Sequence, residues 1–208
     1  LAGTVAKNGA MGVISMADVG YMEEDFSKNP MEANKRGFKK EVEKARNIAQ
    51  NNGIIAVNIM RALSNFEEYV KMAVEEKIDA IIVGAGMPLN LPELVKGSGA
   101  LIAPIVSSVR ALKLILKKWK NNYQRLPDFI VLEGPKAGGH LGFSRQELDD
   151  ENFKIEIPYN SNEIVVEREI ISLNKKLYYF NNGDREELSI GRNRIESKYY
   201  FYNGDMEK

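Results

Sequence analysis

The chain has 208 residues, with 29 Lys and Arg balanced by 29 Asp and Glu, one His, no Cys and 44% hydrophobic residues. This composition is typical of a globular protein with a sizeable core, and zero net charge argues against a nucleic-acid-binding surface. No run approaches the roughly 20 apolar residues that cross a bilayer. The absence of Cys excludes disulfides, thiolate zinc sites and cysteine nucleophiles, and no signal-peptide pattern opens the chain. We therefore expect a cytoplasmic protein without a metal site.

Short apolar or β-branched runs in the first 150 residues predict a series of buried strands. Amphipathic segments between them predict helices, so strands and helices alternate along the chain. This alternation predicts a parallel sheet, and strands that are apolar throughout indicate burial on both faces. The predicted strands are 12–15, 54–58, 80–83, 101–106 and 129–132, and the predicted helices are 39–50, 65–76 and 109–121.

Small or polar residues follow the carboxyl end of each predicted strand. A parallel sheet of this kind is either an open doubly wound sheet or a closed (β/α) barrel, and a barrel builds its active site at the carboxyl ends of its strands. The strand ends therefore favour an α/β protein with TIM-barrel-type (β/α) repeats. The residues at these ends are Ser15, Asn58, 84–86, 107–108 and 133–134.

The composition changes sharply near residue 150. Residues 151–208 contain no Ala and hold nine of the seventeen Phe and Tyr residues, and segment 178–184 recurs as 199–205. Each copy places Asn-Gly after an aromatic run, which favours a tight turn between two strands. We expect two domains, a partial barrel over 1–150 and a small β-hairpin tail over 151–208, and the tail weakly resembles MORN-like or cell-wall-binding hairpin repeats.

The glycine-rich segment after the last predicted strand is the most informative stretch for chemistry. It runs from Glu133 to Phe143 and contains four glycines, which let a backbone approach a flat or anionic ligand closely. The only His of the chain, His140, lies inside it. Because His has the ordinary pKa best suited to proton transfer near neutral pH, His140 is the candidate catalytic residue.

Five segments, taken in order and spacing, resemble the nitronate monooxygenases, a family formerly called 2-nitropropane dioxygenase. That family is closely related to the flavin-dependent enoyl-acyl-carrier-protein reductases. The resemblance covers about residues 1–150. Its segments are 3–15, 57–60, 84–88, 104–108 and the loop from Glu133 to Gly142, which includes Ala137-Gly138-Gly139-His140.

The resemblance implies an FMN-dependent TIM-barrel oxidoreductase that oxidises nitronates or nitroalkanes with oxygen. Asn58 and Glu133 would contact the flavin, Gly138 and Gly139 would lend it backbone groups, and His140 would face the substrate as an acid–base or orienting residue. The residues alone leave simpler roles open, because Asn is a common turn former and Glu is usually solvated. The family often has Gln where this chain has Glu133, and the reductases commonly have Glu, so enoyl reduction with NADH or NADPH is an alternative.

The chain also departs from the family pattern. A full member begins with a strand ahead of the segment that opens this chain, and strands seven and eight, whose loops commonly hold the cofactor phosphate, have no counterpart. We expect an incomplete barrel whose open parallel edge favours association into a homo-oligomer. A third alternative is therefore an inactive barrel fragment whose tail mediates contacts.

Overall fold

The computed structural model describes residues 1–134 and 142–143, together with the backbone of six C-terminal strands. The contacts between Cα atoms divide the chain into two compact units, Leu1–Glu151 and Asn152–Lys208.

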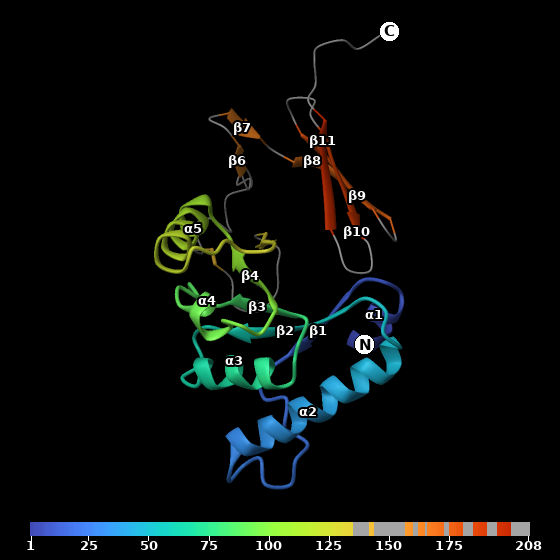
Figure 1. Ribbon diagram of the computed structural model, residues 1–208, viewed down its shortest axis with the longest axis vertical. Coiled ribbons are helices and arrows are strands. Elements are labelled where there is room, and N and C mark those ends of the chain that lie inside the picture. The colour runs from blue at the N-terminus through green and yellow to red at the C-terminus, as the bar shows by residue number, and fades with distance from the viewer. Residues whose placement is uncertain are drawn as a thin grey trace. The chain divides into compact units, whose positions relative to one another are not determined.

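Five parallel strands form the sheet of the first unit, and they lie side by side in chain order (Figure 1). All four neighbouring pairs are parallel. Because the strands lie in chain order, every helical connection adds the next strand at the same growing edge of the sheet. A (β/α) barrel is built in this way. The predicted fold class is confirmed: the unit is a partial TIM barrel. Its strands are β1 (Met11–Ser15), β2 (Ile54–Met60), β3 (Ala80–Gly84), β4 (Leu101–Val106) and β5 (Val131–Leu132).

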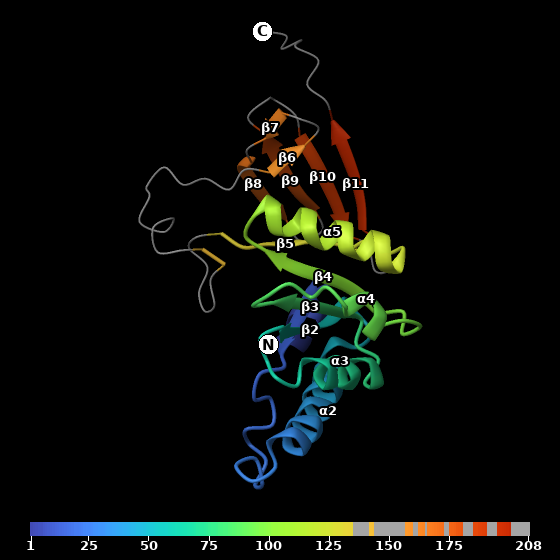
Figure 2. The ribbon, with the colours of Figure 1, turned by 90° about the vertical axis from the view of Figure 1, so that its left-hand side faces the viewer.

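The helices pack against one face of this sheet (Figures 1 and 2). All three predicted helices are confirmed, but the first begins at Pro30 rather than at residue 39. Pro30 occupies the first helical turn and Glu32 lies near the positive end of the helix dipole, a start signal that the periodicity alone did not show. The helices are α1 (Ala2–Lys7), α2 (Pro30–Ala49), α3 (Phe66–Glu75), α4 (Leu91–Leu94) and α5 (Val109–Tyr123).

The two faces of the sheet carry side chains of different size. On the helix face, β2 contributes Ile55, Val57 and Ile59 to a large buried core. On the inner face, a much smaller buried cluster consists of Ala56, Ala80, Ile82 and Ala103. Because side chains alternate between faces along a strand, Asn58 and Met60 of β2 also belong to the inner face. The inner face therefore carries mostly short side chains, and its polar residue Asn58 lies near the carboxyl edge.

Two contacts fix the segments that follow β3 and β4. The indole Nε1–H of Trp119, which is fully buried on α5, donates to the carbonyl oxygen of Pro88 at 2.9 Å. The Ser108 hydroxyl caps α5 by accepting from the Ala111 N–H at 3.2 Å, satisfying one of the free donors of the first turn. The loop after β3 and the turn after β4 are thus both tied to α5.

The second unit is entirely β in its described residues. A four-stranded antiparallel sheet has the order β11-β10-β9-β8, and β6 pairs with β7. The repeated aromatic runs begin in β9 and β11, which both pair with β10, so the predicted hairpin tail is confirmed. The predicted Asn-Gly turns lie outside the described residues. The strands are β6 (Ile157–Tyr159), β7 (Asn162–Ile164), β8 (Val166–Ser172), β9 (Lys175–Phe180), β10 (Arg185–Ile190) and β11 (Ile195–Tyr200).

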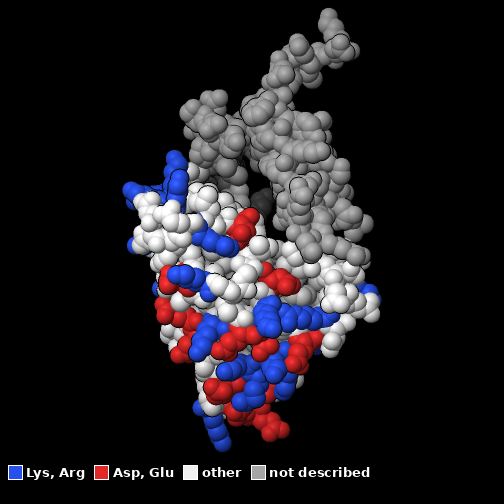
Figure 3. Space-filling model, viewed as in Figure 1, with Lys and Arg blue, Asp and Glu red and all other residues white. Residues whose placement is uncertain are grey.

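Charged side chains of both signs are mixed over α2 and the loop that precedes it (Figure 3). Glu23 accepts hydrogen bonds from Lys40 Nζ at 2.7 Å and from Arg36 Nε at 3.4 Å, and Arg36 also pairs with Asp25. The Lys40 ammonium and, more weakly, the Arg36 guanidinium hold the pKa of the Glu23 carboxyl below its ordinary value. Among the residues that the structure describes, no helix is long and apolar enough to span a membrane.

Candidate functional site

A cleft of about 600 Å³ lies at the carboxyl ends of β2 to β5. Its volume falls in the range of roughly 300–1,000 Å³ that is typical of small-molecule sites. Most of the wall is apolar or glycine, and polar side chains come only from strand ends. The described lining residues are Asn58, Met60, Ala62, Gly84, Ala85, Gly86, Met87, Ile105, Val106, Ser107, Ala111, Ile115, Glu133 and Gly142.

Sheet register brings Ser107 and Glu133 together. Ile105 of β4 lies opposite Val131 of β5 on the inner face, so the residues two positions further along, Ser107 and Glu133, also share that face. The Glu133 N–H donates to the Val106 carbonyl at 2.9 Å and extends the pairing one residue past β5. A hydroxyl and a carboxylate therefore stand side by side at the rim of the cleft.

Both polar groups bind the backbone of Gly142. The Ser107 hydroxyl donates to the Gly142 carbonyl at 2.9 Å, and the Gly142 N–H donates to Glu133 Oε2 at 2.9 Å. Gly142 is nine residues after Glu133, so these contacts bring the two described ends of the glycine-rich segment together at the carboxyl edge. Among the described residues, only Oε2 of the two Glu133 carboxylate oxygens accepts a hydrogen bond.

Asn58 lies on the inner face at the carboxyl end of β2, opposite Ser15 in the register. Its backbone carbonyl accepts from the Met16 N–H at 3.0 Å, which fixes the strand end. Its half-buried side-chain amide has no hydrogen-bond partner among the described residues. An amide with free donors and a free acceptor on a cleft wall is suited to binding the edge of a polar ring.

The segment Gly84-Ala85-Gly86 lines the floor of the cleft with backbone and a single methyl group. A Cβ on Gly84 would lie 2.8 Å from Ile105 Cδ1, so this position accepts no side chain without displacing its neighbour. Ala85 and Gly86 have φ values of 52° and 129°, which turn the chain sharply after β3. A planar ligand could therefore lie against backbone here, and the residues present fit a flavin ring.

Two of the predicted site residues, Asn58 and Glu133, line the same cleft. The other three, Gly138, Gly139 and His140, lie outside the described residues. Sequence reasoning noted Ser107 as a strand-end residue but did not include it in the site. Ser107 lies two positions after Ile105, and this spacing would have indicated that the two side chains share the inner face. No group of three or more potential metal ligands occurs in the described part of the chain.

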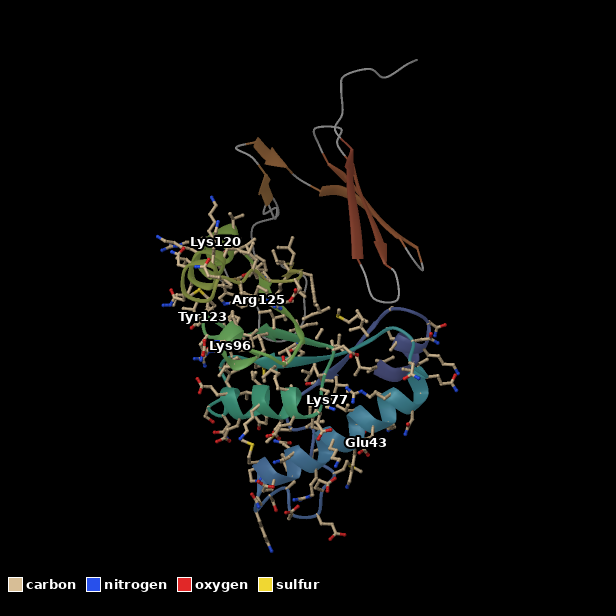
Figure 4. All side chains as sticks on the ribbon, in the orientation of Figure 1. Glu43, Lys77, Lys96, Lys120, Tyr123 and Arg125 are labelled. Atoms are coloured by element: carbon tan, nitrogen blue, oxygen red, sulfur yellow. The ribbon has the colours of Figure 1, made fainter. Side chains whose placement is uncertain are left out.

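A second, smaller hollow of about 350 Å³ lies near the amino end of β4. Lys96, Tyr123 and Arg125 line it, and Figure 4 shows these side chains around the loop before β4 and the end of α5. Arg125 Nη2 already donates to Asp128 Oδ2 at 2.7 Å. The buried Nε of Arg125 has no hydrogen-bond partner among the described residues. This hollow lies at the end of the sheet opposite to the large cleft.

A curled sheet of parallel strands with a cleft across their carboxyl ends defines a (β/α)-barrel-type protein. A family model described as nitronate monooxygenase matches residues 1–159, and the chain belongs to this family.

Solved structures support the fold. FabK from Thermotoga maritima superposes with a TM-score of 0.51 at 22% identity over 71% of this chain, and a single-residue mutant of that protein gives 0.51 at 23% identity over 68%. The matched region spans 40% of the length of either FabK chain. At this level of identity the likeness concerns the fold alone. No curated protein matches the chain.

Proposed function

We propose that this chain carries the flavin and substrate site of an FMN-dependent oxidoreductase of the nitronate monooxygenase type. The observation that carries the proposal is the cleft, in which Asn58, Ser107 and Glu133 surround a glycine floor at the carboxyl ends of the strands. In barrels this edge is where ligands bind and reactions occur. Membership of the nitronate monooxygenase family supports the same reading.

The described residues would hold FMN in two ways: by leaving space for the ring and by hydrogen bonding to it. Gly84 would leave room for a flat ring, because it has no Cβ. The Asn58 amide would hydrogen-bond to the flavin, and the second carboxylate oxygen of Glu133 would accept from it. Gly138 and Gly139, which lie outside the described residues, would lend it backbone groups.

His140 acts on the substrate in this proposal. FMN, when bound, supplies the redox chemistry by taking electrons from the nitronate and passing them to oxygen. The imidazole of His140 orients the nitro group or exchanges a proton with the substrate, since its ordinary pKa allows both protonation states near neutral pH. Met60 and Ile105 make part of the cleft wall apolar.

Enoyl-acyl-carrier-protein reduction is the second candidate. It is favoured by Glu133, because the flavin-dependent reductases commonly have Glu where nitronate monooxygenases often have Gln. This reaction would also need NADH or NADPH as the reductant. An inactive barrel with a contact-forming tail is the third candidate. Cytoplasmic location, self-association and the absence of a nucleic-acid partner stay predictions.

Anaerobic mixing separates the three candidates. The chain is incubated with FMN, desalted, and mixed without oxygen with a nitronate or with NADPH while the visible flavin band is followed. Bleaching by the nitronate and recovery on admitting oxygen supports the proposal. Bleaching by NADPH and recovery on adding an enoyl thioester supports reduction. A band that neither reagent bleaches supports the inactive barrel.

A further inference from the structure

We infer that the second hollow, near the amino end of β4, is a binding site for a small phosphate monoester that also carries a hydroxyl group. The hollow has a volume of about 350 Å³, which lies within the range of small-molecule sites. Its wall comes from two segments, 92–100 and 122–125, and it shares no lining residue with the large cleft. The site is therefore separate from the one proposed for the flavin.

The guanidinium of Arg125, on the wall of this hollow, has donors that lack an acceptor. Nη2 donates to Asp128 Oδ2 at 2.7 Å and to the Ala100 carbonyl at 3.5 Å. Nε, which is buried, and Nη1 have no partner among the described residues. The side chain as a whole is 40% exposed, so a ligand in the hollow can reach it. Because guanidinium donors match oxyanions and unpaired buried donors are costly, Arg125 favours an anionic ligand.

The loop before β4 adds backbone donors to the same wall. Gly97 and Gly99 have φ values of 80° and 74°, and they alternate with Lys96 and Ser98, which have no positive φ. The N–H groups of the two glycines have no partner in the described part of the chain, and a Cβ on either would meet open space. Loops that alternate in this way form concavities that bind anions through backbone N–H groups.

The number of donors favours a phosphate over a carboxylate. Lys96 is exposed, lines the hollow and makes no ion pair with the described residues, and Figure 4 shows it near Arg125. Together with the two glycine N–H groups, these side chains offer more donors than the two oxygens of a carboxylate can use. A phosphate monoester has three strong acceptor oxygens and carries up to two negative charges. The donor set therefore fits a phosphate group.

Glu93 indicates the second feature of the ligand. It is the one acidic residue among the described residues that line the hollow, and its carboxylate makes no hydrogen bond to the described residues. A carboxylate repels a bare anion, but it accepts a hydrogen bond from a hydroxyl group. The wall thus pairs donors for a phosphate with an acceptor for a hydroxyl, so the ligand class is a hydroxylated phosphate monoester.

Amide NMR of the full chain tests the site directly. The chain is titrated with inorganic phosphate, glycerol phosphate and acetate at constant ionic strength. We expect both phosphates to shift the Gly97 and Gly99 signals saturably, with glycerol phosphate binding more tightly and acetate at least about tenfold more weakly. The control signal is Gly9, which has a φ of 85° but donates its N–H to the Ala6 carbonyl. No shift at Gly97 and Gly99, equal binding of acetate, or no advantage for glycerol phosphate would overturn the inference.

Variants of the two cations should weaken phosphate binding. Arg125→Lys keeps the charge but loses the planar fork, and we expect an affinity about tenfold lower. Lys96→Met should lower the affinity about threefold, as suits an exposed charge. Lys113→Met is the matched control, because Lys113 is exposed on α5 and does not line the hollow. Equal losses in Lys96→Met and Lys113→Met would mean that only the general charge matters, and the inference would be wrong.

Glu93→Gln gives an effect of opposite sign, which a folding defect cannot mimic. It should raise the affinity for inorganic phosphate about twofold, because a repulsive charge is removed, and reduce the advantage of glycerol phosphate. An unchanged affinity for both probes would count against the assigned ligand class. None of these measurements uses flavin, so failure of the chain to bind FMN would count against the proposed function alone.

Discussion

The two ends of the parallel sheet use carboxylates in different ways. At the amino ends, Asp79 stands directly before β3 and Asp128 stands three residues before β5. Their carboxylates accept from the backbone N–H groups of Ile55 and Ile102, each at 2.8 Å. At the carboxyl end, Glu133 also accepts from a backbone N–H, but that group belongs to a loop beside a cleft. The chemical group is the same at both ends: it joins strands at the amino ends, and in the proposed function it also binds the ligand at the carboxyl end.

The amino-end contacts form a repeated motif. Asp79 donates its own N–H to the Ile55 carbonyl at 3.1 Å while its carboxylate accepts from the Ile55 N–H, and Asp128 does the same with Ile102, where the first distance is 3.0 Å. Each Asp thus makes two hydrogen bonds to the backbone of one residue in the preceding strand. These contacts join neighbouring strands, whereas Asn58 at the other end keeps its amide free among the described residues. In barrels, function gathers at the carboxyl end and stability at the amino end.

The largest expected effect concerns the carboxyl end. His140→Ala should lower turnover of a nitronate by at least about 100-fold, which is the lower bound of what a positioned acid–base group contributes. FMN retention should not change, since the variant removes no proposed flavin contact. The measurement is steady-state oxygen uptake by the flavin-loaded chain. Unchanged uptake would remove His140 from the mechanism.

Filling the floor of the cleft should have the next largest effect. Gly84→Val places a branched side chain where even a Cβ lies 2.8 Å from Ile105 Cδ1, and we expect FMN affinity to fall at least about tenfold. Flavin fluorescence titration measures this.

Gly97→Ala is the control for the floor variant. Gly97 lines the second hollow, and a Cβ there meets open space, although its φ of 80° makes a side chain strained. This variant should lose about 1 kcal/mol of stability and keep its FMN affinity. Equal FMN affinity in both variants would contradict a binding site over Gly84.

The amino-end motif should affect stability alone. Asp79→Ala and Asp128→Ala should each lower the free energy of unfolding by about 1–2 kcal/mol, because a backbone N–H in each case loses its acceptor. Urea denaturation gives these values, and FMN affinity of the folded variants should equal that of the wild type. Loss of FMN binding without loss of stability would reverse the assignment of the two ends.

The smallest expected effect lies outside both ends, in the ion pairs of Glu23. Because the pKa of Glu23 is lowered in the folded chain, its contribution is present at neutral pH and is lost as the pH falls through that lowered value. Glu23→Gln should therefore shift the urea midpoint at pH 7, and this shift should shrink as the pH falls. Glu24→Gln, at an exposed neighbour, should not shift the midpoint. A Glu23→Gln shift of the same size at neutral and acid pH would contradict the charge-based account.

Much of the fold could be predicted because buried parallel strands have a strong sequence pattern. All five strands and three main helices followed from apolar runs and periodicity, and Asn58 and Glu133 were expected together because parallel strands end at one edge. The Asp motif was missed, although each Asp precedes an apolar run at the same position: Asp79 before 80–83 and Asp128 before 129–132. The contacts of Gly142 could not be predicted, since they depend on the register between β4 and β5.

The most direct test of the account is the visible spectrum of three proteins after incubation with FMN and desalting: the wild type, Gly84→Val and Asp79→Ala. The account predicts a near-stoichiometric flavin band in the wild type and in Asp79→Ala, and a strongly reduced band in Gly84→Val. No band in the wild-type chain, or an equal band in all three, would contradict the claim that the carboxyl end of this sheet binds the flavin.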